Sequence, residues 1–142
     1  VYERGVSELE FLYEVEDMDE FVRNVALVAY SRITREVLET VSFLREKIPE
    51  LESVDYEVKV ASGILEEAVQ SKSLEDKLDM VKIALSHFES ALGEVRSLVV
   101  DMERRGVRIE ELYHVLGDLQ SIVSNLSSYL NQLRQKLEEN VG

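Results

Sequence analysis

The chain contains no cysteine and no tryptophan, and it has one proline among its 142 residues. The absence of cysteine excludes disulfides, thiolate metal sites and cysteine nucleophiles. No apolar run approaches the roughly 18 residues that a membrane-spanning helix needs, and no signal-peptide pattern opens the chain. Glycine-rich phosphate-binding loops and the Gly-x-Ser-x-Gly turn of serine hydrolases are also missing. Few of the usual sequence signatures of an enzyme remain.

Basic residues are scarce, with 16 Lys and Arg against 29 Asp and Glu, and the formal net charge is −13 at pH 7. A polyanion repels phosphate backbones and anionic lipid head groups, so we expect neither nucleic acid nor a membrane as a partner. The imbalance is steepest between Arg4 and Arg23, where seven acidic residues and no base occur. This acidic N-terminal segment, residues 1–17, is either a solvated terminus or a docking strip for a basic protein partner.

Apolar residues at helical spacing are abundant in the second half of the chain. Two heptad ladders run from Leu74 to Met102 and from Ile109 to Leu137, and in both the apolar positions alternate steps of four and three. A seam with an average spacing of about 3.5 residues lets two helices interlock their side chains along their whole length. The sequence therefore predicts two long helices that pack against each other.

Local signals divide the chain into four expected helices. Pro49 ends one helix and starts the next, Ser73 followed by Asp76 resembles a capping box, and Gly106 has the position of a C-terminal cap. Short turns make neighbouring helices antiparallel, and a chain of this length forms one domain. We expect an all-α fold, an antiparallel four-helix bundle over residues 1–142, with helices at 18–48, 51–72, 74–105 and 108–139.

The first helix and the segment before it are less regular. Residues 6–16 fit a short helix with a capping box at Ser7 and Glu10, but the alternation of apolar and acidic residues also fits a strand. In the first helix, repeated steps of four place a set of apolar residues on one face, which we expect to be its core side. These residues are Val22, Ala26, Ala29, Ile33, Val37, Val41, Leu44 and Ile48.

Unequal helix lengths predict apolar ends that a monomer does not cover. At 1.5 Å per residue the last two helices are about 48 Å long and the second about 32 Å, so helices overhang at both ends of the bundle. Exposed apolar area on this scale marks an interface, and a symmetric homodimer would cover both ends. The expected contact residues are Phe21 and Val25 at one end, and Val99, Met102, Ile109 and Leu112 at the other.

A further candidate interface lies on the last expected helix, because residues 119–133 contain no charged side chain. Solvent-facing helix surfaces normally carry Lys, Glu and Arg, which are also better helix formers than Ser and Asn. An uncharged outer face is either drift on a tolerant surface or a contact with a second subunit. The residues expected to make that contact are Ser124, Ser128, Tyr129 and Asn131.

One carboxylate pattern offers an enzymatic alternative. Glu36 and Glu39 lie one turn apart on the first helix, and Glu52 and Asp55 lie one turn apart at the start of the second. This arrangement, over about 20 residues, resembles the magnesium-binding signature of MazG-like all-α nucleotide pyrophosphohydrolases, although Arg35 stands where that family prefers an acid. The resemblance implies four carboxylates that hold Mg²⁺ for attack on a nucleoside triphosphate.

From these observations we expect a non-enzymatic helical scaffold, adaptor or regulatory interaction domain that self-associates, without catalytic residues, cofactor or metal. A cytoplasmic location fits the absence of cysteine. Two alternatives stay open. One is the Mg²⁺-dependent pyrophosphohydrolase, and the other is a helical signalling module excised from a longer protein, since the chain begins with Val1.

Overall fold

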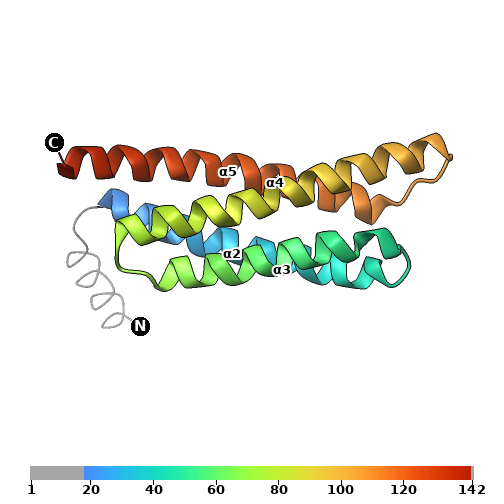
Figure 1. Cartoon of the computed structure of the whole chain (residues 1–142), viewed down its shortest axis with the longest axis horizontal. Helices are drawn as coiled ribbons and strands as arrows, with labels where there is room; N and C mark the ends of the chain where they lie inside the picture. The colour runs from blue at the N-terminus through green and yellow to red at the C-terminus, as the bar shows by residue number, and fades with distance from the viewer. Residues whose placement is uncertain (1–17, 142) are drawn as a thin grey trace, which may run out of the picture.

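The computed structural model describes residues 18–141, which form four α-helices and one short 3-10 turn (Figure 1). The elements are α2 (Met18–Arg45), η1 (Pro49–Leu51), α3 (Glu52–Gln70), α4 (Leu74–Arg104) and α5 (Glu110–Val141). This part of the chain contains no strand, and the expected all-α four-helix fold is confirmed. The acidic strip in residues 1–17, and the choice between helix and strand for residues 6–16, lie outside the described residues.

The residues that were expected to separate the first three helices do so. Ile48 has an extended backbone, with φ −124° and ψ 88°, because the ring of the following Pro49 disfavours helical geometry there. The Ser73 hydroxyl oxygen accepts a hydrogen bond from the backbone N–H of Asp76 at 3.3 Å and thereby caps α4. The largest departure from the expected bounds is at the end of α2, which stops at Arg45.

The turn between α4 and α5 is built on Gly106, whose φ of +74° is the positive value that L side chains rarely adopt. The N–H of Gly106 donates to the carbonyl of Glu103 at 3.0 Å, and the N–H of Val107 donates to that of Met102 at 2.9 Å. This pair of bonds is the Schellman motif, and it satisfies carbonyls that the end of a helix would otherwise leave without donors.

The four helices form a closed ring in which α3 packs on α2, α4 on α3, α5 on α4, and α5 again on α2. Consecutive helices run antiparallel, and the α4–α5 hairpin reaches past the α2–α3 turn (Figure 1). None of the helices in residues 18–141 is long and apolar enough to cross a lipid bilayer.

The buried stripe of α5 is wider than the strict heptad seam. Val115 and Ile122, which lie beside the seam, are fully buried, whereas the seam residues Leu116 and Val123 are only partly buried. The reason is that α5 faces two neighbours, α4 and α2, and a bundle helix with two neighbours buries a broader stripe than a helix in a two-stranded coiled coil.

The expected core face of α2 is wrong over the first half of that helix. Val22, Ala29 and Ile33 are exposed, and the structure buries Leu27 and Thr34 instead. The inward face of α2 is in fact a heptad ladder with unbroken steps of four and three, but several of its positions are polar or aromatic, so hydrophobicity alone does not reveal it. Its members in α2 are Arg23, Leu27, Tyr30, Thr34, Val37, Val41 and Leu44, and the step pattern continues to Ile48 beyond the end of the helix.

Candidate functional site

The first half of α2 carries a continuous apolar face on the outside of the bundle. Its valines and isoleucine keep large exposed fractions, 57% for Val22, 51% for Val25, 39% for Val28 and 36% for Ile33. Because the heptad ladder occupies the inward face, the remaining apolar residues of this segment are turned away from the core. We call this face the α2 stripe, and its members are Phe21, Val22, Val25, Val28, Ala29 and Ile33.

A groove follows the α2 stripe to the end of α3. It has a volume of about 630 Å³ and is lined by stripe residues, by Asn24 and Arg32 of α2, and by Val69 of α3. At one edge the side-chain oxygen of Asn24 accepts a hydrogen bond from the Lys77 ammonium of α4 at 2.8 Å. The groove is therefore mainly apolar, and Asn24 and Arg32 are the polar residues that line it.

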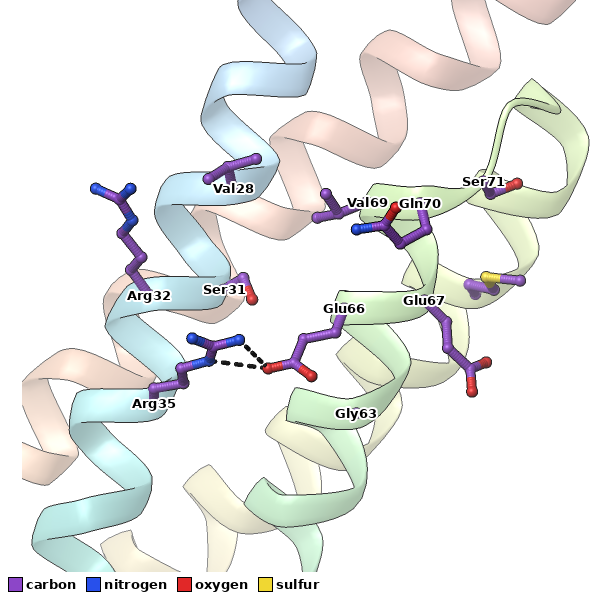
Figure 2. A pocket seen from close by; sticks show the side chains of 11 residues that line it. Val28, Ser31, Arg32, Arg35, Gly63, Glu66, Glu67, Val69, Gln70 and Ser71 are labelled. Atoms are coloured by element: carbon purple, nitrogen blue, oxygen red, sulfur yellow. Dashed lines mark hydrogen bonds and ion pairs between the residues drawn. The ribbon is translucent and has the colours of Figure 1, made fainter.

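A second and more polar groove of about 910 Å³ lies between α2 and α3 and shares Val28, Arg32 and Val69 with the first (Figure 2). The Arg35 guanidinium crosses this groove and donates to one carboxylate oxygen of Glu66 at 2.6 and 2.8 Å. Figure 2 shows that Arg32 extends away from α3. Both partners of the Arg35–Glu66 pair are substantially exposed, so the pair adds at most about 1 kcal/mol to stability.

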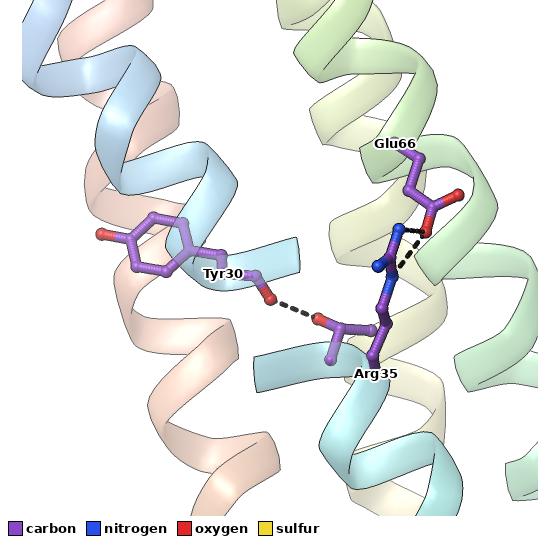
Figure 3. Close-up of polar contacts among 4 residues, drawn as sticks. Tyr30, Arg35 and Glu66 are labelled. Carbon is purple, nitrogen blue, oxygen red and sulfur yellow. Dashed lines mark hydrogen bonds and ion pairs between the residues drawn. The ribbon is translucent and has the colours of Figure 1, made fainter. Parts of the chain in front are cut away.

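Polar residues of the α2 heptad ladder satisfy their hydrogen bonds unequally. The fully buried Thr34 hydroxyl donates to the backbone carbonyl of Tyr30 at 2.7 Å (Figure 3). Tyr30 and Arg35 leave opposite sides of α2, and Arg35 points toward α3 (Figure 3). A threonine can therefore occupy the core because the preceding turn of its own helix supplies the acceptor.

Arg23 and Tyr129 form a buried polar patch between α2 and α5. One terminal nitrogen of Arg23 and the hydroxyl of Tyr129 are shielded from solvent, and neither finds a hydrogen-bond partner in the described part of the chain. Burial raises the pKa of Tyr129 to about 12, an effect that the nearby Arg23 charge opposes and that Tyr30 reinforces. Tyr129 is 3% exposed, so the expectation that it belongs to an outer contact face is wrong. It faces inward because α5 buries a stripe wide enough to include it.

At the α4–α5 end, the expected uncovered apolar surface is present only in part, since Val100 and Val107 are 42% and 43% exposed. Val99 is 5% exposed and Leu112 is 1% exposed, because the two helices insert these side chains between each other. Met102 and Ile109 are partly buried. Two of the four residues proposed for this interface thus belong to the core, which corrects the expectation drawn from helix lengths.

Polar side chains near the α4–α5 turn also contact one another. The Tyr113 hydroxyl donates to the Glu103 carboxylate at 2.5 Å, and the Arg108 guanidinium lies 4.5 Å from the centre of the Tyr113 ring. Hydrogen bonding to Glu103 raises the pKa of Tyr113, and pairing with Arg108 at 2.7 Å lowers the pKa of Glu110.

The four carboxylates of the enzymatic alternative do not form one site. The buried Asp55 accepts hydrogen bonds from Arg45 at 2.9 Å and from Ser42 at 2.7 Å, while Glu36, Glu39 and Glu52 are exposed. Within residues 18–141, no three histidine or carboxylate side chains are placed to hold a metal ion together. The arrangement that the MazG-like resemblance implies is therefore absent from the described residues, and Asp55 instead joins α2 to α3.

The uncharged outer face of α5 is present as a surface, since Ser124, Ser128 and Asn131 are exposed. Of the apolar end residues, Phe21 and Val25 lie on the α2 stripe. Sequence reasoning missed the contribution of Ala29 and Ile33 to that stripe, because it assigned both to the core. The unbroken steps of four and three through Arg23 and Thr34 could have shown that Ala29 and Ile33 lie on the outer face.

Compared with known proteins, the chain matches no protein-family model, no curated protein sequence and no solved structure.

Proposed function

We propose that the protein is a non-enzymatic helical interaction domain that self-associates as a homodimer through the α2 stripe. The observation that carries this proposal is the row of exposed valine and isoleucine side chains on the outer face of α2, among which Arg32 is the charged residue. Contiguous exposed apolar surface of this kind marks contact sites, because leaving it in water has a cost that burial removes.

The dimensions of the stripe suit a helix-to-helix contact. From Phe21 to Ile33 it covers about 18 Å of helix, and a two-fold symmetric dimer would place the same face of α2 from each copy together. Such a contact buries less than the standard 800 Å² or so per partner, so we expect an affinity of about micromolar rather than nanomolar strength.

Charge does little to oppose this contact. Arg23 lies on the core side of α2, and Arg35 pairs with Glu66 of α3. Arg32 lines the groove and follows Val28 by one turn on the same face of α2, and its long side chain lets the guanidinium stay in water while the apolar residues beside it are covered.

Light scattering over a series of protein concentrations tests the proposal. We expect a rise from monomer to dimer mass with increasing concentration, and a loss of the dimer in Val25→Glu, which places a charge in the middle of the stripe. Val100→Glu is the matched control, since Val100 of α4 is 42% exposed but lies outside the stripe. Monomer mass at all concentrations, or a Val25→Glu variant that dimerises like the wild type, would exclude the stripe as the association surface.

Two further points belong to the proposal. The outer face of α5 with Ser124, Ser128 and Asn131 is uncharged. A second copy or another protein could bind there without the desolvation of a charged side chain.

A cytoplasmic location remains our expectation for this cysteine-free chain.

A further inference from the structure

A small pocket between the first turns of α2 and the C-terminal part of α5 shares Arg23 with the buried polar patch. Its volume is about 320 Å³, at the lower end of the range in which proteins bind small molecules. The lining combines an apolar side chain of α2, charged groups from both helices and two amides of α5. The lining residues are Val22, Arg23, Gln132, Gln135, Lys136 and Glu139.

Arg23 is a buried cation for which the described residues supply no complete set of partners. It is 8% exposed, and one of its terminal nitrogens is shielded from solvent without a hydrogen-bond partner within residues 18–141. The Tyr129 hydroxyl of the same patch is also shielded and also has no partner there. A guanidinium has five N–H donors and no acceptor, so the group that is missing beside Arg23 is an acceptor of hydrogen bonds. An anion would supply this acceptor and would also compensate the buried charge.

The pocket lining favours one class of anion. A carboxylate matches the fork of N–H groups on a guanidinium, and the amides of Gln132 and Gln135 offer further donors. The Glu139 carboxylate lines the same pocket and opposes a second negative charge, so a phosphate group, with a charge of about −2, fits less well. The net charge of −13 acts in the same direction, because it repels multiply charged anions more strongly than singly charged ones.

We propose that this pocket binds a small monocarboxylate, which places its carboxylate on the Arg23 guanidinium and against the Gln132 and Gln135 amides. Val22 offers an apolar contact for the carbon atoms of such a ligand. Lys136 has an interaction partner of its own, so Arg23 is the cation on which the site depends. Binding of this kind does not require self-association, because the α2 stripe need not be a contact surface for the pocket to exist.

Thermal unfolding of the full chain tests the site, with sodium acetate as the probe and sodium chloride at the same ionic strength and pH as the reference. A ligand that binds only the folded state raises Tm. At ten times its dissociation constant the rise should be about 5 °C for a chain of 142 residues. General effects of a salt on unfolding act on all variants alike, so binding is measured by the part of the rise that a change in the pocket removes.

Two pairs of variants make this comparison. Arg23→Met removes the guanidinium and keeps a long side chain, and Arg32→Met is its control on the exposed side of α2. Gln135→Glu adds a negative charge to the pocket at an exposed position, where folding is not affected, and Gln120→Glu is its exposed control elsewhere on α5. We expect the two pocket variants to lose the acetate-dependent rise in Tm and the two controls to keep it.

The same variants define the results that would overturn the proposal. An equal rise in the wild type and in both pocket variants would mean that a buried water, not an anion, is the partner of Arg23. An equal pocket-dependent rise with sodium phosphate would overturn the preference for a single charge.

A nuclear magnetic resonance titration gives a direct readout of the guanidinium. The Arg23 Nε–H signal, identified by its absence from the spectrum of Arg23→Met, should shift with acetate until it saturates in the wild type and should not shift in Gln135→Glu. A signal that acetate leaves unshifted in the wild type would contradict the site even if Tm rises.

Discussion

At the α4–α5 end of the bundle, two heptad ladders meet over their full length, and Val99 and Leu112 are buried although the hairpin extends past the α2–α3 turn. At the opposite end, the first half of α2 places Arg23 and Thr34 at positions of its inward ladder and leaves four large aliphatic residues outside. The difference teaches that exposure depends on the position of apolar residues in the heptad frame, not on helix overhang.

The largest effect expected from this comparison is at the α4–α5 end. Leu112→Ala should lower the free energy of unfolding by about 3 kcal/mol, because it removes buried methyl groups and leaves a cavity between two packed helices. Urea denaturation followed by circular dichroism measures this change. A loss below about 1 kcal/mol would mean that this end is not packed as the structure shows.

At the other end, Arg23→Leu should change the free energy of unfolding in the opposite direction. The guanidinium is buried, and one of its nitrogens has no hydrogen-bond partner among the described residues, so a shorter apolar side chain, which has no charge to desolvate, should raise the free energy of unfolding by about 2 kcal/mol. The same urea titration measures it, with Arg32→Leu on the outer face as the control. Destabilisation by Arg23→Leu would show that Arg23 contributes net stability to the contact with α5.

Tyr129 gives a smaller, pH-dependent effect. Its pKa is raised from 10.0 to about 12 in the folded state, so between these values the native protein retains a proton that the unfolded chain releases. Stability must therefore fall as pH rises above 10, by at most about 1.4 kcal/mol per pH unit from this group. Urea unfolding at several alkaline pH values should show a shallower decline for Tyr129→Phe. Equal slopes for the two proteins would contradict the burial of this hydroxyl.

Most of the fold could be predicted from the sequence, because α4 and α5 carry apolar residues at nearly every heptad position, and because Pro49, Ser73 and Gly106 mark the turns. The orientation of α2 could not, since its ladder contains Arg23, Tyr30 and Thr34. A count of hydrophobic residues favours the wrong face. Only the step pattern, extended backward from Val37, leads to the face that the structure buries.

The candidate site could be predicted only in part, because helix lengths and residue spacing do not show which side chains face the core. Helix lengths predicted contact residues at both ends of the bundle. Val25 is exposed, and its role in an interface stays a prediction, whereas Val99 and Leu112 are buried by the packing of α4 on α5. The carboxylate pair on α3 illustrates a similar limit. Spacing alone cannot show that Asp55 is engaged by Arg45 and Ser42.

The central claim, that the α2 stripe is where two copies meet, is tested most directly by single cysteines in this cysteine-free chain. Val25→Cys lies in the middle of the stripe, and Val100→Cys has comparable exposure outside it. Under mild oxidation at about ten micromolar protein, in the range of the expected affinity, we predict a disulfide-linked dimer for Val25→Cys and little for Val100→Cys. Equal cross-linking of the two variants, or faster cross-linking through position 100, would contradict the claim.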